Sequence, residues 1–238
     1  MVTETQARNA YDVFHQRFEV DEEAQAPWHG MLKPFLLAED LRGKRVLEIG
    51  CGRGGFSCWL AKNCGPELTA ADFSPAGVKM GRDYAASLGL PVRWQVMDIQ
   101  SIAHPNATFD CVISCETIEH VPNPALALRE LARVLKPGGK LFLTTPNYFN
   151  AMGLYRGYMR LRGTPFTEGG QPINNFVTLP RTLRWVRDAG LKLCHTDSRG
   201  MYLPIPGRPW TLADWLDHPR LLTRWLGLHS LVIATRPE

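Results

Sequence analysis

The sequence predicts an α/β fold in which crossover helices connect the strands of a single sheet. Strand and helix patterns alternate along the chain from Lys44 onward, which is typical of this class. The clearest junction is an apolar run, residues 46–49, that breaks into a glycine-rich turn at residues 50–55. The length of 238 residues fits one domain with appended elements.

Each element follows from its own local pattern. Phe56, Trp59 and Leu60 recur at helical spacing after the glycine turn, and Ser74-Pro75 opens a second helix at 76–88. A third, amphipathic helix at 124–135 ends at the Lys136-Pro137-Gly138-Gly139 break. The predicted strands are 46–49, 67–73, 92–97, 109–114, 140–145, 191–196 and 230–235.

Composition excludes several classes of protein. The chain is 45% hydrophobic and 21% charged, and no apolar run reaches the roughly 18 residues of a membrane span. Residues 1–23 are polar and acidic, unlike a signal peptide, so we expect a cytoplasmic location. The six cysteines form no Cys-x-x-Cys pair and lie mostly in apolar stretches, which favours reduced core thiols over a disulfide framework or a zinc knuckle.

The net charge of +4 is unevenly distributed. Between residues 156 and 199, eight arginines and lysines face three acidic residues. This pattern is typical of a solvated basic face, and the alternatives are contact with phosphates or with a membrane surface. Nucleic acid is not the favoured partner, because no recognisable RNA-binding module accompanies the domain.

The glycine turn satisfies two cofactor patterns. Gly50, Gly52 and Gly55 spell the Gly-x-Gly-x-x-Gly of dinucleotide-binding dehydrogenases, with Asp72 about 20 residues further on. Glu48, Gly50, Gly52 and Gly54 instead form a Glu-x-Gly-x-Gly-x-Gly turn. In either case glycines at a strand-to-helix junction let the backbone approach a ligand, and free N–H groups of the helix favour anionic groups.

Acidic residues follow three predicted strands, at the sheet edge where open α/β folds hold ligands. For S-adenosylmethionine, Asp72 suits the ribose diol, with Phe73 beside the adenine, and Asp98 suits the adenine amino group, with Ile99 in apolar contact. Glu48 suits the ammonium of the methionine part. The alternative is a purely structural role, in which the two aspartates only cap helices or form turns. The predicted cofactor-binding residues are Glu48, Gly50, Cys51, Gly52, Gly54, Asp72, Phe73, Asp98, Ile99 and Cys115.

Two further motifs, later in the chain than the glycine turn, distinguish between the two cofactor patterns. Residues 109–113, Phe-Asp-Cys-Val-Ile, and 135–141, Leu-Lys-Pro-Gly-Gly-Lys-Leu, match strand motifs of class I S-adenosylmethionine-dependent methyltransferases, which the chain resembles from Val46 to Thr145. The resemblance implies a Rossmann-like seven-stranded sheet whose last strand, here 231–234, is antiparallel, with helices on both faces. A hydride-transferring enzyme is not expected to carry these later motifs.

The segment 115–124 is similar to that of ubiquinone-biosynthesis O-methyltransferases. Its Glu-x-x-Glu-His also resembles small-RNA terminal 2′-O-methyltransferases. In those families the glutamates and the histidine bind a divalent metal, which implies Glu116, Glu119 and His120 here. Spacings of three and four place them along one side of a helical turn, and such ligands suit Mg²⁺ or Mn²⁺. Without a metal, His120 is the natural general base. The catalytic candidates are therefore His120 and Glu119.

The sequence thus predicts an O-methyltransferase acting on a hydroxyl of a small-molecule metabolite, with metal assistance left open. The alternatives are N- or C-methylation and, more distantly, an NAD(P)-binding oxidoreductase or a non-catalytic cofactor-binding module. We divide the single domain into an N-terminal helical cap (1–40), a cofactor-binding core (41–146), an aromatic and basic insertion (147–180) and the C-terminal part of the sheet (181–238). The insertion is interpreted as a substrate lid or a peripheral membrane contact, against a core-packing helix. No oligomeric state is predicted.

Overall fold

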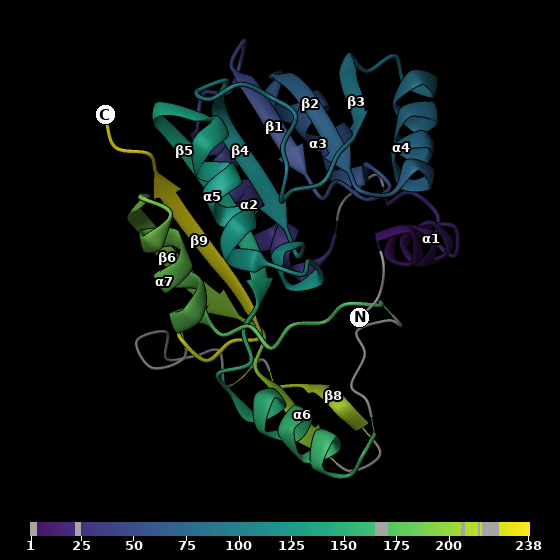
Figure 1. Cartoon of the computed structure of the whole chain (residues 1–238), viewed down its shortest axis with the longest axis vertical. Helices are drawn as coiled ribbons and strands as arrows, with labels where there is room; N and C mark the ends of the chain where they lie inside the picture. The colour runs from purple at the N-terminus through teal and green to yellow at the C-terminus, as the bar shows by residue number, and fades with distance from the viewer. Residues whose placement is uncertain (1–3, 22–24, 165–170, 206–207, 214, 216–223) are drawn as a thin grey trace.

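A computed structural model describes residues 4–21, 25–164, 171–205, 208–213, 215 and 224–238. Its main feature is a seven-stranded sheet in the order β3-β2-β1-β4-β5-β9-β6, surrounded by helices (Figure 1). The strands of this sheet are β1 Arg45–Ile49, β2 Glu67–Asp72, β3 Val92–Val96, β4 Phe109–Cys115, β5 Leu135–Pro146, β6 Lys192–Arg199 and β9 His229–Thr235. The helices are α1 Glu4–His15, α2 Pro27–Ala38, α3 Gly55–Cys64, α4 Pro75–Ser87, α5 Pro124–Val134, α6 Ala151–Leu161 and α7 Leu179–Asp188, with a 3₁₀ helix, η1, at Ile118–His120.

Strands β1 to β5 are parallel, and β9 runs antiparallel between β5 and β6. The predicted sheet with an antiparallel last strand is therefore confirmed. Strand β1 has β2 on one side and β4 on the other, so the winding of the sheet reverses there. In open α/β sheets such a reversal leaves a crevice at the carboxyl ends of the strands.

Helices cover both faces of the sheet because successive strand residues point to opposite sides. Val46 of β1 belongs to a buried cluster with residues of α2 and α3, among them Leu36 and Leu60. Its neighbour Leu47 belongs to the other cluster, which includes Leu128 of α5 and residues of α7. Two apolar layers thus clamp β1 and fix the end of the strand that carries the glycine turn.

One predicted boundary is wrong. The break expected at residues 136–139 does not separate α5 from β5, because β5 begins at Leu135 and pairs with Phe109 of β4. The pairing shifts register between Phe109 and Cys111, and Gly138 adopts a φ of +75°. The Pro-Gly-Gly turn is therefore absorbed as an irregularity inside the strand.

The insertion departs from the main sheet. Helix α6 lies against a two-stranded sheet formed by β7 (Tyr202–Ile205) and β8 (Arg208–Leu212), below the seven strands (Figure 1). An extended segment, residues 171–178, leads back from this region to α7. Within the described residues, no helix is both long and apolar enough to cross a membrane.

Candidate active site

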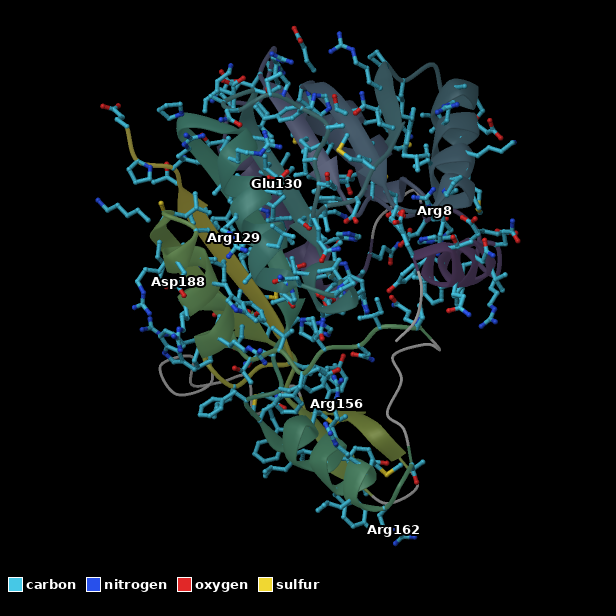
Figure 2. The ribbon with its side chains drawn as sticks, in the orientation of Figure 1. Arg8, Arg129, Glu130, Arg156, Arg162 and Asp188 are labelled. Carbon is cyan, nitrogen blue, oxygen red and sulfur yellow. The ribbon has the colours of Figure 1, made fainter. Side chains whose placement is uncertain are left out.

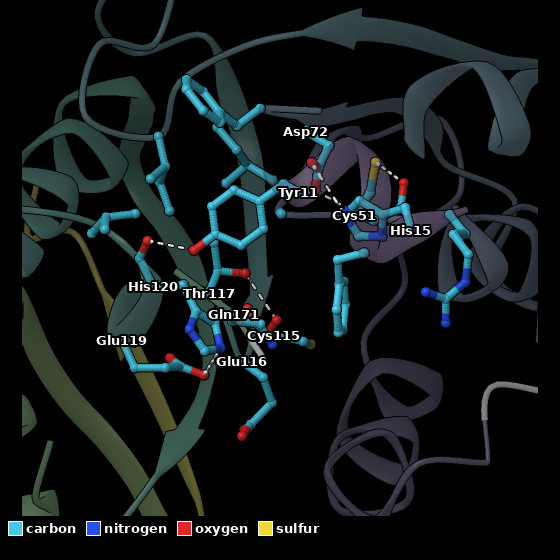
Figure 3. A pocket seen from close by; sticks show the side chains of 18 of the residues that line it. Tyr11, His15, Cys51, Asp72, Cys115, Glu116, Thr117, Glu119, His120 and Gln171 are labelled. Carbon is cyan, nitrogen blue, oxygen red and sulfur yellow. Dashed lines mark hydrogen bonds and ion pairs between the residues drawn. The ribbon is translucent and has the colours of Figure 1, made fainter. Parts of the chain in front are cut away.

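A cavity of about 800 Å³ opens at the carboxyl ends of β1, β2 and β4 (Figure 3). All of the residues predicted from the sequence to bind the cofactor or metal, or to act in catalysis, line it. They come from segments far apart in the chain, since strand ends, α1, the glycine turn and the 171–178 segment all contribute to the wall. A cavity of this size is typical of a site for a cofactor and a small substrate.

The glycine turn needs its glycines. Gly50, Gly52 and Gly54 have φ values of +80°, +53° and +77°, a region that side chains disfavour. A Cβ on Gly50 would also lie 2.0 Å from Thr117 Oγ1. The turn therefore bends sharply against the end of β4 and leaves its backbone exposed to the cavity.

Gly55, the third glycine of the dinucleotide pattern, has a different role. A Cβ there would lie 2.0 Å from the backbone oxygen of Asp21, in the segment that links α1 to α2. Arg53 Nε also donates a hydrogen bond to the backbone oxygen of Glu19, at 3.0 Å. The glycine at position 55 thus lets the N-terminal segment cross directly over the start of α3.

We expect Gly55→Ala to lower the free energy of unfolding by about 1–3 kcal/mol, because the added methyl group must displace that segment. Urea unfolding measures the change. Gly30→Ala is the matched control, since no atom of the described residues lies within 4 Å of a Cβ at that helical position and alanine favours the helix. A Gly55→Ala protein as stable as the original would contradict the close approach.

Asp72 is buried and its carboxylate is held by backbone donors. Its Oδ2 accepts from Gly52 N and its Oδ1 from Ser74 N, both at 2.8 Å. His15 Nε2 of α1 lies 3.8 Å from Oδ1, while the buried His15 Nδ1 has no hydrogen-bond partner among the described residues. Burial lowers the pKa of His15, which favours the neutral ring. The carboxylate is thus oriented at the cavity wall where β2 ends.

Glu48 is almost fully buried at the base of the glycine turn. The Ser57 hydroxyl donates a hydrogen bond to its carboxylate, and burial raises its pKa to about 8. Burial likewise raises the pKa values of the Cys51 and Cys115 thiols, which remain neutral in the wall. A buried, protonated carboxyl at the cavity wall is suited to a ligand whose cation restores the carboxylate.

Phe73, Asp98 and Ile99 form the side of the cavity next to β2 and β3. Asp98 accepts from Gln100 N at 2.8 Å, and Ile99 is buried. The Phe73 and Tyr11 rings lie edge-on, with 6.4 Å between their centroids. The Arg8 guanidinium lies 4.7 Å from the centroid of the Phe73 ring. This wall offers an aromatic face, an apolar side chain and a carboxylate in close succession.

Glu119 and His120 face each other where β4 ends (Figure 3). Glu119 is fully buried, and its Oε2 accepts from Thr145 Oγ1 at 3.0 Å. Its Oε1 lies 3.5 Å from His120 Nε2 and accepts no hydrogen bond from the part of the chain that the structure describes. Burial raises the pKa of Glu119 to about 8. His120 Nδ1 lies 2.8 Å from the backbone oxygen of Ile173. The pair is thus a buried acid beside an imidazole at the cavity.

The prediction that Glu116, Glu119 and His120 share one side of a helical turn is wrong. Only residues 118–120 are helical, and Glu116 precedes them with a φ of +46°. Its Oε2 lies 4.0 Å from His229 Nδ1. In the described part of the chain, no group of three or more His, Cys, Asp or Glu side chains can hold a metal ion.

Carboxyl groups outnumber basic side chains in the cavity wall, and burial keeps two of them, Glu48 and Glu119, mostly protonated at pH 7. Among its described lining residues Arg53 is the one arginine or lysine, whereas seven residues carry carboxyl groups: Glu4, Asp21, Glu48, Asp72, Asp98, Glu116 and Glu119. This lining favours a ligand with positive charge, such as a sulfonium with an ammonium. It opposes the doubly negative pyrophosphate of a dinucleotide.

Helix α1 covers one side of the cavity. Asp12 Oδ1 accepts from Ala76 N at 3.0 Å and from the Ser74 hydroxyl, which ties α1 to the start of α4. The Tyr11 hydroxyl donates a hydrogen bond to the backbone oxygen of His120, at 3.0 Å. One helix thus bridges the ends of β2 and β4, across the mouth of the crevice.

Sequence reasoning missed several lining side chains, among them His15 and His229. His229 opens β9, where burial lowers its pKa to about 4 and Trp28 lies 5.4 Å away between ring centroids. The helical spacing of aromatic residues in the N-terminal region was the available signal for His15. Nothing local marks His229, because it reaches the cavity only through the pairing of β9 with β5.

Comparison with known proteins agrees with this geometry. Residues 47–143 match the methyltransferase domain family. The chain is 35% identical over 203 residues to the ubiquinone biosynthesis O-methyltransferase of Xanthomonas euvesicatoria pv. vesicatoria (strain 85-10), covering 83% of this chain and 78% of the relative. It is 33% identical to the enzyme of the same name from Xylella fastidiosa (strain 9a5c), covering 83% and 76%. The solved [4+2]-cyclase SpnF shares the fold at a TM-score of 0.67 and 20% identity, over 99% of this chain and 97% of that one.

Proposed function

This chain belongs to the S-adenosylmethionine-dependent methyltransferases, and we propose that it methylates a hydroxyl group of a small-molecule metabolite. The observation that carries the proposal is the Glu119–His120 pair, which stands at the wall of the cavity that also holds Asp72 and the glycine turn. The relatives named ubiquinone biosynthesis O-methyltransferase support a hydroxyl acceptor.

The cofactor fits the wall between β1 and β3. We place its ribose at Asp72, its adenine between Phe73 and Ile99 with Asp98 at the amino group, and its methionine end at Glu48 and the glycine turn. The acidic lining supports this placement, because the cofactor carries a sulfonium and an ammonium. The remaining wall, which includes His120, Tyr148 and His229, is left for the acceptor.

When bound, S-adenosylmethionine supplies an electrophilic methyl group whose carbon–sulfur bond breaks as the methyl–oxygen bond forms. The protein holds the acceptor oxygen in line with that bond and excludes water, and such positioning contributes about 7–11 kcal/mol in well-oriented reactions. The hydroxyl proton passes to His120 Nε2, and the positive charge of the resulting imidazolium favours the carboxylate form of the adjacent Glu119, whose pKa burial raises to about 8.

The experiment that tests the reaction type uses methyl-¹³C S-adenosylmethionine. Pools of hydroxylated and amine-bearing small molecules are incubated with the protein, and the product's ¹³C shift distinguishes an O-methyl from an N-methyl group. We expect an O-methyl signal. N-methylation is the second candidate because an acidic cavity also attracts a cationic amine. An N-methyl or C-methyl signal would overturn the proposed acceptor class.

Glu48 gives a pH-dependent prediction. Its pKa is raised to about 8 in the empty cavity, so at pH 7 the side chain is mostly protonated. An ammonium beside it favours the carboxylate, and S-adenosylmethionine binding at pH 7 is therefore expected to release nearly one proton. Calorimetry in buffers of different ionisation enthalpy measures this number. Glu48→Gln should abolish the release and Glu119→Gln should keep it; equal release by the original protein and Glu48→Gln would contradict the assignment.

The same carboxyl couples stability to pH. Its folded pKa of about 8 exceeds the usual 4.5, so the folded empty protein binds the proton more tightly than the unfolded chain. This contribution is complete below pH 4.5 and is lost as the pH rises toward 8. Glu48→Gln should flatten the fall in melting temperature over that range.

Metal removal is expected to leave the reaction unchanged. Within the described residues, Glu116, Glu119 and His120 do not form a group that could hold a metal ion. We therefore expect the same turnover before and after exhaustive dialysis against a chelator. Loss of turnover that Mg²⁺ or Mn²⁺ restores would show that these side chains rearrange around an ion.

A further inference from the structure

The 171–176 segment connects the insertion to the Glu119–His120 turn. The backbone oxygen of Ile173 lies 2.8 Å from His120 Nδ1. Two residues later, Asn175 N donates to the backbone oxygen of Glu119 at 2.8 Å, and Asn175 Nδ2 donates to that of Val121 at 2.7 Å. Three hydrogen bonds thus join this segment to three consecutive residues of the turn, including the ring of His120.

Arg156 of α6 holds the other side of the same segment. Its guanidinium donates to the backbone oxygens of Asn174 and Asn175 and to Asn174 Oδ1, and it lies 4.6 Å from the centre of the Tyr148 ring. Figure 2 shows Arg156 on the side of α6 that faces the rest of the molecule and Arg162 at the far end of the helix. Burial lowers the pKa of Arg156, and its stacked, multidentate contacts favour arginine over lysine.

The contact with Ile173 determines which ring nitrogen of His120 carries the proton. A carbonyl oxygen only accepts, so Nδ1 must be the donor. In the neutral ring the lone pair then lies on Nε2, which is 3.5 Å from Glu119 Oε1. An unconstrained histidine prefers the opposite arrangement, with the proton on Nε2.

We propose that Arg156 and Asn175 are positioning residues of methyl transfer, which fix His120 with its proton on Nδ1 by holding the Ile173 carbonyl against the ring. The role of His120 as a base rests on the proposed function, whereas the protonation pattern of the ring does not. The insertion thereby takes part in the chemistry through hydrogen bonds to the turn, beyond any covering of the substrate.

The test is the protonation pattern of the His120 ring, which needs no acceptor. The protein is labelled with ¹⁵N in its histidine rings, and correlation spectra record which nitrogen carries the proton at a pH where the ring is neutral. His120→Gln identifies the signals by their loss. We expect Nδ1 protonated in the original protein and in the control Arg162→Lys, and a shift toward Nε2 protonation in Arg156→Lys and in Asn175→Ala.

Protonation of Nε2 in the original protein overturns the proposal, as does an unchanged Nδ1 proton in both variants. Cofactor affinity and melting temperature verify that a variant is folded, and if one variant fails to fold the other decides. Once an acceptor that the protein methylates is known, folded Arg156→Lys and Asn175→Ala proteins should show a kcat that is ~10-fold to ~100-fold lower. Their KM for S-adenosylmethionine should be unchanged. If His120→Gln keeps full turnover while the predicted proton pattern is found, the proposed base fails and the positioning of the ring stands.

Discussion

Replacing Asp72 by alanine is expected to weaken binding of S-adenosylhomocysteine by about 100-fold or more. A carboxylate that accepts both ribose hydroxyls contributes about 1.5–3 kcal/mol per charged hydrogen bond, and each 1.4 kcal/mol is tenfold in affinity. Isothermal titration measures the loss. Asp83→Ala is the matched control, because Asp83 lies exposed on α4, paired with Lys79, and the substitution removes the same charge without touching the cavity.

The structure also gives Asp72 a local role, since it accepts from Gly52 N and Ser74 N. A thermodynamic cycle separates the two roles: the affinities of the original protein and of Asp72→Ala are measured both for S-adenosylhomocysteine and for an analogue that lacks ribose hydroxyls. If Asp72 binds the diol, the substitution costs much less affinity for the analogue than for the complete ligand. Equal losses for both ligands would mean that the carboxylate only shapes the turn, which is the capping alternative.

The fold could be predicted because its signals are local. The apolar run 46–49 alternates between two buried clusters, and the positive φ angles of the glycine turn require the residues that stand there. The start of β5 was missed because a Pro-Gly-Gly sequence normally ends an element, whereas here pairing with Phe109 keeps the chain extended. Tertiary pairing therefore overrode local propensity at this point.

The site was predictable as a set of positions but not as a geometry. Strand ends converge in this topology, so the acids at 48, 72 and 98 could be placed at one edge. The direction of Glu116 could not, because it depends on one positive φ and on His229, which arrives from 113 positions further along the chain. The contacts of His120 with Ile173, and of Asp72 with His15, are likewise long-range and leave no trace in local spacing.

Replacing His120 by glutamine is expected to lower kcat for methyl transfer by ~10²- to 10⁴-fold, the usual contribution of a positioned general base, with cofactor affinity within about twofold. Glutamine keeps a polar side chain of similar length but does not accept the hydroxyl proton. Steady-state kinetics on the acceptor identified by ¹³C labelling measure the change. His104→Gln is the control, because His104 pairs with Gln95 at 2.8 Å and does not line the cavity.

Glu119→Gln should also reduce kcat, because glutamine cannot ionise, whereas the Glu119 carboxyl can become a carboxylate beside the charged imidazole and stabilise it. The double variant should be no slower than His120→Gln, since Glu119 acts only through the histidine and residues that work as a unit are not additive. Full activity of His120→Gln with normal cofactor binding would assign proton removal to another group. Additive losses would show that Glu119 contacts the acceptor independently, which its buried Oε1 beside His120 Nε2 argues against.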